Sequence, residues 1–523
     1  MKTKLAIPIG AKNLQQGKEQ IKAAIKAGAE ILELRVDYLE NLNTEMVKGL
    51  IAEVKSSKNP LPIVVTCRDK RQGGDISYPD RLRVEVLVDA LEAGAGFIDF
   101  EYENFLYAES QESIKRALAQ SITGRLILSA HNFQMRFDNI GKLYRHIETL
   151  YPAAIPKLVY TANHINDCFE AFDLLHRTSG ERIIFCMGQT GLISRIIAKK
   201  LGSFITFASI DGDNATASGQ LTAEQLKKRY RYDSINAETE LYGLIGSPIA
   251  HSLSPAVHNA CFAKANVDKL YLPLHVQGGA EDFNHFLRNV TCRPWLGFRG
   301  FSVTIPHKQN ALDYVRENNG SIDPLARRIG AVNTLLINTD GRAAGYNTDC
   351  SGALDAITSA MKIERSDLKN MAVSIVGAGG VARAIVAGLS DAGAKIKIYN
   401  RTVKKAEKLA GEFACEFVSL DDLQNLQTKL LINCTSVGMY PNVETTAVPK
   451  EFLKRGMTVF DTVYNPAETL LLKDAKEKRA KRISGIDMFV NQASAQFKLF
   501  TGWDADPKLM RKIVTEKLAP GNS

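Results

Sequence analysis

Gly377-Ala378-Gly379-Gly380-Val381-Ala382-Arg383 is the stretch that decides the fold of the second half of the chain. It follows an apolar, β-branched run over residues 372–376 and precedes a helical run over residues 384–389. A strand, a tight glycine turn and a helix in this order predict a parallel α/β unit. Gly377 permits the turn, Gly379 lets the backbone approach a pyrophosphate, and Ala382 keeps the helix close to the strand. The pattern G-x-G-x-x-A indicates a dinucleotide site, although such glycine turns also occur for packing reasons alone.

The residues after the next predicted strand indicate which dinucleotide binds. That strand, residues 395–399, ends in Asn400-Arg401-Thr402, with Lys404 and Lys405 close behind. An acidic residue at this place would accept a hydrogen bond from a ribose 2′-hydroxyl, whereas arginine and lysine suit a 2′-phosphate. We therefore expect NADP(H) rather than NAD(H).

Composition excludes several classes of protein. The 523 residues, 45% of them hydrophobic, are enough for two to four domains, and the net charge of +9 is spread along the chain. No basic stripe indicates nucleic acid binding, and no apolar run approaches the roughly 18 residues of a membrane span. The eight cysteines lie far apart without a C-x-x-C pair, so we expect no zinc site and a reducing, cytoplasmic compartment. A strand predicted at residues 5–9 leaves no room for a leader peptide.

The first 232 residues alternate short apolar runs with helical segments. The runs cover residues 5–9, 31–36, 63–67, 97–100, 126–129, 157–160, 183–186 and 204–208. Alternating strands and helices favour a parallel sheet, and this number of units in this length predicts a (β/α)8 barrel over residues 1–232. A last charged helix is expected over residues 221–235. Catalytic groups should then lie at the carboxyl ends of the strands.

Polar residues occur at those strand ends. They are Glu33, Arg35, Arg68, Glu101, His131, Lys157 and, just after the seventh strand, Arg195. One such residue is usually a solvated rim residue, but agreement over so many strands favours a site.

Lys157 lies inside an apolar strand, so it must either pair with a carboxylate or lose its charge. Arginines nearby would depress its pKa, which suits a nucleophile that forms a Schiff base with a ketone. His131 suits a general acid/base oriented by Glu101, although it could also be a core histidine. The three arginines predict an anionic substrate.

At these residues the first half resembles type I 3-dehydroquinate dehydratase. The motifs that carry the resemblance are Glu33-Leu34-Arg35-Val36-Asp37, Thr66-Cys67-Arg68, Ile98-Asp99-Phe100-Glu101, the His131 segment, Ile155-Pro156-Lys157 and Gly191-Leu192-Ile193-Ser194-Arg195. The resemblance implies that Lys157 forms an imine with the C3 ketone of 3-dehydroquinate and that Arg195 holds the carboxylate. His131 would remove a C2 proton and help expel the C1 hydroxyl, which yields 3-dehydroshikimate.

Two loops of the first half depart from that family. The loop after the eighth strand usually reads Ser-Ala-Pro-Gly-Gln, and here it reads Thr216-Ala217-Ser218-Gly219-Gln220. Thr216 and Gln220 are still expected to bind substrate, while loss of the proline predicts a looser loop. The family's Glu-Gly-Gly after Arg68 is Gln72-Gly73-Gly74 here.

In the second half a reducible group needs a binding site beside the dinucleotide. Ser252 and Ser254, two apart on an extended loop, could both donate to a carboxylate, although serines ahead of a helix are often simple N-caps. Lys308 comes just after a strand, and Asp349 lies at another strand or loop end. Together they could form an ion pair that moves a proton to a carbonyl oxygen while NADPH supplies hydride.

This half resembles shikimate dehydrogenase. The matching motifs are Ser252-x-Ser254-Pro255, Val303-Thr304-Ile305-Pro306-His307-Lys308, Gly330-Ala331-Val332-Asn333-Thr334, Asn347-Thr348-Asp349, the glycine turn, Asn400-Arg401-Thr402, Asn433-Cys434-Thr435-Ser436-Val437-Gly438-Met439 and Gly485-Ile486-Asp487-Met488-Phe489-Val490-Asn491-Gln492. The resemblance implies Lys308 and Asp349 as the catalytic pair. It implies that shikimate is bound by Ser252, Ser254, Thr304, Asn333, Tyr464 and Gln492. It also implies that the nicotinamide site is lined by Thr435, Ser436, Val437, Gly438 and Met488, and that Gly485 is a further cofactor-binding residue. Ser302 and Cys350 stand where many members have Asn and Gly.

The two resemblances together imply a bifunctional enzyme of the shikimate pathway that needs no metal. Its second half would comprise a shikimate-binding lobe over residues 239–345, completed by residues 487–523, and a Rossmann NADP-binding domain over residues 346–486. We expect small-molecule substrates and no nucleic acid or membrane partner, and the oligomeric state stays open. Two alternatives also stay open: the second half could prefer quinate, or the barrel could be a non-catalytic regulatory or binding domain.

Overall fold

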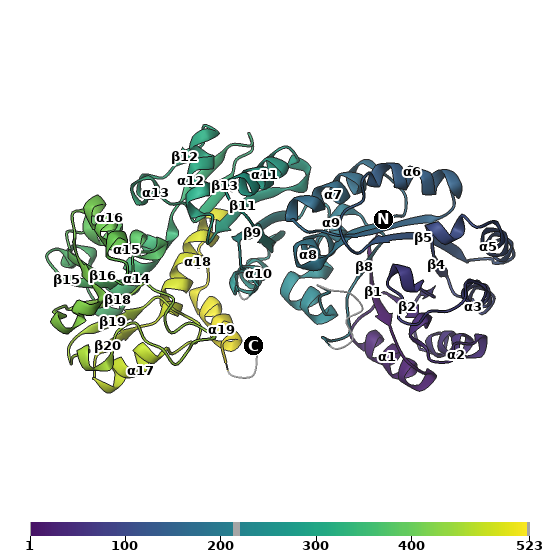
Figure 1. Ribbon diagram of the computed structural model, residues 1–523, viewed down its shortest axis with the longest axis horizontal. Coiled ribbons are helices and arrows are strands. Elements are labelled where there is room, and N and C mark those ends of the chain that lie inside the picture. Colours follow the sequence, from purple (N-terminus) through teal and green to yellow (C-terminus); the bar gives the residue numbers. More distant parts are fainter. Residues whose placement is uncertain (1, 213–219, 251, 520–523) are drawn as a thin grey trace. The chain divides into compact units, whose positions relative to one another are not determined.

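The computed structural model describes residues 2–212, 220–250 and 252–519 (Figure 1). The chain divides into two compact units, and each is described by itself. The first comprises Met1–Thr239 and Leu274–Val276, and the second comprises Glu240–Pro273 and Gln277–Ser523. Within the described residues, no helix combines the length and the apolar character needed to span a bilayer.

The first unit is built on an eight-stranded sheet whose neighbouring strands are all parallel. Its strands are β1 (Lys4–Ile9), β2 (Ile31–Arg35), β3 (Ile63–Thr66), β4 (Phe97–Glu101), β5 (Arg125–Asn132), β6 (Ile155–Thr161), β7 (Ile183–Met187) and β8 (Ile205–Phe207). The hydrogen-bonded order β7-β6-β5-β4-β3-β2-β1-β8 is that of a barrel. Where its two ends meet, the rings of Phe185 and Phe207 lie 5.5 Å apart. The predicted barrel is confirmed.

Helices follow the strands and surround them in Figure 1. They are α1 (Leu14–Lys26), α2 (Thr44–Lys55), α3 (Asp80–Glu92), α4 (Tyr102–Phe105), α5 (Ala108–Gln120), α6 (Ile140–Leu150), α7 (Cys168–Arg177), α8 (Gly188–Ile196) and α9 (Ala198–Leu201). The continuous helix expected over residues 221–235 is wrong. A π-helical segment, Gln225–Arg229, is followed by a separate 3-10 turn, Tyr232–Ser234, because Arg231 between them has a φ of 53°, in the left-handed region.

The first lobe of the second unit contains a mixed sheet of order β10-β9-β11-β13-β14-β12. Its elements are β9 (Glu240–Gly246), α10 (Ser254–Lys264), β10 (Lys269–His275), α11 (Ala280–Thr291), β11 (Phe298–Val303), α12 (Lys308–Glu317), β12 (Ser321–Ile322), α13 (Pro324–Ile329), β13 (Thr334–Ile337) and β14 (Ala343–Tyr346). Strand β13 runs antiparallel to β11 and to β14.

The second lobe contains a parallel sheet of order β17-β16-β15-β18-β19-β20. Its elements are α14 (Thr348–Met361), β15 (Ala372–Val376), α15 (Gly380–Asp391), β16 (Lys395–Asn400), α16 (Val403–Phe413), β17 (Glu416–Ser419), β18 (Leu430–Asn433), β19 (Thr458–Asp461), α17 (Leu470–Glu477) and β20 (Lys481–Ile483). Counted from β15, this order is 3-2-1-4-5-6, the doubly wound Rossmann arrangement, whose ligand site lies where the order reverses, between β15 and β18.

The last two helices, α18 (Gly485–Thr501) and α19 (Pro507–Lys517), return to the first lobe. Phe497, Phe500 and Met510 join Tyr242 and Phe262 in one buried apolar cluster. Helix α18 also packs against α14, where a Cβ added at Gly352 would lie 2.9 Å from Cβ of Gln492. One helix therefore contributes to both lobes and positions Gln492 between them.

Candidate active sites

Residues that point into the barrel are arranged in layers because strand side chains alternate with period two. One layer, including Ile31, Val64, Ile127, Ile155 and Ile183, is buried and apolar. Two residues further along the same strands, the inward-facing positions are Glu33, Thr66, Ser129, Lys157 and Phe185. The change from apolar to charged side chains collects polar groups at the carboxyl ends of the strands.

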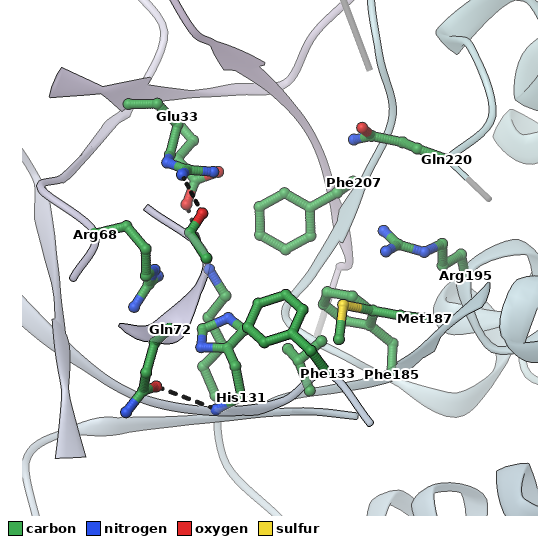
Figure 2. A pocket seen from close by; sticks show the side chains of 14 residues that line it. Glu33, Arg68, Gln72, His131, Phe133, Phe185, Met187, Arg195, Phe207 and Gln220 are labelled. Atoms are coloured by element: carbon green, nitrogen blue, oxygen red, sulfur yellow. Dashed lines mark hydrogen bonds and ion pairs between the residues drawn. The ribbon is translucent and has the colours of Figure 1, made fainter. Parts of the chain in front are cut away.

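A cavity opens at this end of the barrel (Figure 2). It is lined by Glu33, Arg35, Arg68, Gln72, Gly73, His131, Phe133, Lys157, Val159, Phe185, Met187, Arg195, Phe207 and Gln220. In the view of Figure 2, Arg195 and Gln220 lie on the side of the cavity away from Arg68. Thr216, which is expected to bind substrate from the same loop as Gln220, lies outside the described residues.

Lys157 is only 4% exposed and is paired with two carboxylates. Its Nζ lies 2.7 Å from Oδ2 of Asp99 and 3.3 Å from Oε1 of Glu33. Of the two outcomes that the sequence left open, the structure shows pairing with a carboxylate. Burial by itself raises the pKa of Asp99, but the charges of Arg68 and Lys157 hold it below its usual range. Asp99 therefore stays ionised beside the lysine.

His131 is desolvated, and its imidazole is neutral. Burial lowers the pKa of His131 well below its usual value, and the positive charges of Arg68 and Lys157 lower it further. Its backbone N–H donates to Oε1 of Gln72 at 3.3 Å, and its ring stacks on Phe133. A neutral imidazole beside a lysine suits a proton acceptor.

The expected contact between Glu101 and His131 is absent from the described residues. Glu101 Oε1 accepts from Arg68 and from the backbone of Asp69, and Oε2 accepts from Arg83 and Asn104. Because two guanidiniums already surround this fully buried carboxylate, it does not turn toward the imidazole. Buried His131 Nδ1 has no hydrogen-bond partner in the described part of the chain.

The three arginines of the cavity are not equivalent. Arg35 forms a bidentate pair with Asp37, at 2.8 and 2.7 Å, and Arg68 pairs with Asp99 and Glu101. Arg195 has no carboxylate partner among the described residues, and its guanidinium stacks over the Phe185 ring at 4.4 Å. Burial lowers the pKa of Arg195 to about 10, so this guanidinium stays charged near neutrality. Arg35 and Arg68 thus have carboxylate partners inside the protein, and among the described residues Arg195 is the cavity arginine left to receive a substrate anion.

The glycine turn of the second unit lies at the reversal point of the Rossmann sheet. Gly377 has a φ of 111°, and a Cβ added to it would come within 3.0 Å of Thr435 Cγ2 on the loop after β18. Helix α15 begins at Gly380 without a side-chain cap, and added Cβ atoms at Gly379 and Gly380 would meet nothing within 4 Å. Free N–H groups at a helix N-terminus and open space beside them fit a pyrophosphate.

The other expected cofactor residues follow the carboxyl ends of β16 and β18 or begin α18. Asn400 ends β16, and exposed Arg401 and Thr402 follow it. No ion pair of Arg401 is found in the described ranges, so its charge is available to a 2′-phosphate. Ser436, Val437 and Gly438 continue the loop after β18, while Gly485 and Met488 begin α18.

Lys308 and Asp349 come together from different elements. Lys308 is the first residue of α12 and Asp349 lies in the first turn of α14. Lys308 Nζ is 2.6 Å from Oδ2 of Asp349. The side chain of Asn347 caps α14 by accepting from the backbone N–H of Asp349 at 3.1 Å, which fixes the carboxylate in this position.

Four expected substrate ligands lie in the first lobe. The two serines are not on an extended loop: Ser254 opens α10, and its backbone N–H donates to Ser252 Oγ at 3.3 Å. The N-cap residue of α10 is Leu253, and no described side chain caps this helix, so neither serine is its N-cap. Thr304 follows β11, and Asn333 precedes β13 with its amide bonded to Thr348.

The remaining two expected ligands meet at α18. Tyr464 packs its ring against Phe489 of α18 at 5.1 Å, and Gln492 lies one turn further along that helix.

Known families match both units in chain order. Residues 5–237 match the model of type I 3-dehydroquinase. Residues 244–335 match the shikimate dehydrogenase substrate binding domain, residues 359–461 match shikimate / quinate 5-dehydrogenase, and residues 485–515 match the shikimate 5′-dehydrogenase C-terminal domain. A chloroplastic bifunctional 3-dehydroquinate dehydratase/shikimate dehydrogenase of Arabidopsis thaliana is 36% identical over 98% of this chain and 84% of that protein. The chain belongs to this bifunctional family.

Similarity to separate shikimate dehydrogenases covers the second unit. The shikimate dehydrogenase (NADP(+)) of Methanosarcina acetivorans is 40% identical over 53% of this chain and 98% of that protein. A crystal structure of a shikimate dehydrogenase in complex with NADP+ shares 39% identity and a TM-score of 0.50, covering 55% of this chain and 98% of that one.

Sequence reasoning overlooked three residues of this bifunctional chain that contact predicted site residues. Asp99 holds Lys157, and Ser129 donates to Asp99 Oδ1 at 2.6 Å. Both are polar positions two residues before Glu101 and His131 on the same strands, so strand periodicity contained the signal. Asn433, fully buried at the end of β18, accepts from the backbone N–H of Thr435 at 3.0 Å and orders the loop beside the glycine turn.

Proposed function

We propose that the barrel dehydrates 3-dehydroquinate to 3-dehydroshikimate and that the second unit reduces 3-dehydroshikimate to shikimate with NADPH. The observation that carries this proposal is the pairing of Lys157 with Asp99 and Glu33 inside a barrel cavity. The same chain contains a Lys308–Asp349 pair and a glycine turn suited to a dinucleotide. Membership of the bifunctional family supports both activities.

In the barrel, Lys157 would attack the substrate ketone and release water, so that the positive charge of the ammonium passes to the iminium nitrogen. Asp99 and Glu33 stabilise that charge in both states because neither carboxylate has to move. Neutral His131 would accept the C2 proton and return it to the departing C1 hydroxyl, which leaves as water. A second water then hydrolyses the iminium and restores the lysine. Arg195 would hold the substrate carboxylate, with Arg35, Arg68 and Gln220 lining the same cavity.

In the second unit, bound NADPH supplies the hydride. Lys308 would donate the proton to the carbonyl oxygen as it gains negative charge, and Asp349 would hold the ammonium in place. Ser252, Ser254, Thr304, Asn333, Tyr464 and Gln492 are the residues we propose to bind the substrate. The glycine turn would hold the pyrophosphate, Arg401 the 2′-phosphate, and the loop of Thr435 the nicotinamide.

We assign the three domains as the sequence predicts them: the barrel, the shikimate-binding lobe with α18 and α19, and the Rossmann domain. All eight cysteines are free thiols, which supports a reducing compartment, and we propose the cytoplasm. The ligands in this proposal are small anionic molecules and NADP(H); it includes no nucleic acid.

The test is NADPH oxidation by the whole chain, started in one cuvette with 3-dehydroquinate and in another with 3-dehydroshikimate. Oxidation is expected in both. Lys157→Ala should abolish the first and spare the second, whereas Lys308→Ala should abolish both NADPH signals and leave formation of 3-dehydroshikimate from 3-dehydroquinate intact. Oxidation with 3-dehydroshikimate alone would overturn the barrel assignment.

A further inference from the structure

Six buried charges of alternating sign form a continuous chain through one side of the barrel. Each is at most 4% exposed. In order of contact, the residues are Arg83, Glu101, Arg68, Asp99, Lys157 and Glu33. This chain of charges begins with Arg83 on α3, outside the strands, and ends with Glu33 on β2, beside the lysine proposed to react.

The inner contacts are short and use separate atoms. Arg68 Nη1 lies 3.0 Å from Glu101 Oε1, and Arg68 Nη2 lies 2.8 Å from Asp99 Oδ1. The other oxygen of Asp99 contacts Lys157 at 2.7 Å. Glu101 and Asp99 therefore each bridge two cations, and Arg68 and Lys157 each bridge two carboxylates, so displacement of one of these groups disturbs its neighbours.

Arg83 closes the outer end. Its Nη2 donates to Glu101 Oε2, and its Nε donates to the carbonyl oxygen of Cys67 at 3.0 Å. Its Nη1 donates to Asp80 Oδ1 at 2.9 Å and to Asp69 Oδ2 at 3.4 Å, and its guanidinium lies over the Phe100 ring. Glu33, Arg68 and Lys157 line the cavity, while Arg83, Glu101 and Asp99 are absent from its described lining. Arg83 therefore has no direct route to substrate, and burying a guanidinium is costly unless its charge is compensated.

The charges of the chain cancel only when all six groups are ionised. Arg83, Arg68 and Lys157 supply three positive charges, and Glu101, Asp99 and Glu33 supply three negative ones. When Lys157 becomes a neutral amine to attack a ketone, one negative charge is left uncompensated. A further loss of positive charge makes that deprotonation harder, because like charges gather in a region of low dielectric.

We propose that Arg83 is a positioning residue of the barrel site, which acts through Glu101, Arg68 and Asp99 to set the charge balance around Lys157. This inference rests on the proposed dehydratase function. The other charged or titratable groups at the cavity are Arg35 of β2, His131 of β5 and Arg195 of α8. Arg35 is neutralised by Asp37, and burial keeps His131 uncharged, so Arg195 adds one positive charge on the substrate side. Strands β7 and β8 present the apolar rings of Phe185 and Phe207.

The experiment measures dehydratase kcat and KM of the whole chain from pH 5 to 9, without NADPH, by the absorbance of the enone formed. Arg83→Gln removes the charge, and Arg83→Lys keeps it. Arg182→Gln is the matched control, because Arg182 is also buried in the barrel but donates to the carbonyl oxygens of Leu175 and Gly180 at 2.6 Å each.

For Arg83→Gln we expect the pH at which kcat falls on the acid side of its profile to rise by about 1 unit. Below that pH, kcat should be about tenfold lower than in the unmodified protein, and KM should be unchanged. In Arg83→Lys the acid side of the kcat profile should return to the pH of the unmodified protein, and in Arg182→Gln it should stay there. Glu101→Gln, which removes a negative charge from the same chain, should move the acid side of the profile in the opposite direction, and it decides the matter where Arg83→Gln does not fold.

An unmoved acid side of the kcat profile in folded Arg83→Gln, or an equal shift in Arg182→Gln, would overturn the inference. Absence of dehydratase activity in the unmodified chain is a different result, since it removes the proposed function itself.

Discussion

Oδ2 of Asp99 lies 2.7 Å from Nζ of Lys157, although the two residues come from strands β4 and β6 on either side of β5. The other oxygen of Asp99 is held by Arg68 and Ser129 at 2.8 and 2.6 Å. The carboxylate is fully buried, so its charge acts on the lysine with little screening by water. Asp99 thus contacts Lys157 without lining the cavity.

Replacing Asp99 by Asn should lower dehydratase kcat about a hundredfold, because the amide has nearly the same shape but does not stabilise a positive charge on Lys157. Formation of 3-dehydroshikimate from 3-dehydroquinate measures the effect. Reduction of added 3-dehydroshikimate is the control and should be unchanged, since the second unit performs it. A variant that keeps full dehydratase activity would contradict the importance of this pair.

Arg195→Gln should raise the KM for 3-dehydroquinate by about 10- to 100-fold, the effect of losing a charged hydrogen-bond partner. Because no described carboxylate pairs with Arg195, the substitution leaves no buried anion uncompensated, and the thermal midpoint should not fall. Steady-state kinetics and thermal unfolding measure the two effects. An unchanged KM together with a large loss of stability would show that Arg195 is structural.

Arg401→Ser should raise the KM for NADPH about tenfold or more and leave the KM for NADH unchanged, because only NADPH has the 2′-phosphate that this side chain is expected to bind. Initial rates of 3-dehydroshikimate reduction with each cofactor measure this. The control is Arg455→Ser, because Arg455 is an exposed arginine just before the amino end of β19, whereas Arg401 follows the carboxyl end of β16 in the same parallel sheet. An equal rise in the KM for NADPH and the KM for NADH would show that Arg401 does not bind the 2′-phosphate.

The burial of His258 should make the stability of the second unit sensitive to acid. It is fully buried, stacks on Tyr271, and burial lowers its pKa to about 3, against about 6.5 in the unfolded chain. Between these values the unfolded state binds more protons, so this histidine lowers the free energy of unfolding by up to about 1.4 kcal/mol for each unit that pH falls below 6.5. This contribution is absent above pH 6.5.

His258→Phe should therefore flatten the loss of stability between pH 6.5 and 5. Urea unfolding followed by tryptophan fluorescence measures it selectively, since the two tryptophans of the chain, Trp295 and Trp503, both belong to the second unit. If the variant and the unmodified chain lose stability equally over this range, another group is responsible.

The order of strands and helices could be predicted from sequence because it depends on local periodicity. Apolar runs separated by helical segments predicted every strand of the barrel, and the glycine turn predicted the Rossmann unit around Gly377. The predicted helix over residues 221–235 failed at Arg231, where one residue adopts a left-handed conformation that no local pattern indicated.

The sequence by itself therefore determined the two units, their fold classes and which residue types stand at the strand ends. Only the tertiary structure decided how the charges pair: Lys157 with Asp99, Glu101 with Arg68 and Arg83, and Arg195 with no described carboxylate. Periodicity places a side chain on a face of its own strand, whereas a partner comes from strands and helices distant in sequence. In a buried site each carboxylate takes the nearest cation that the barrel geometry brings to it, because leaving either charge unpaired is costly.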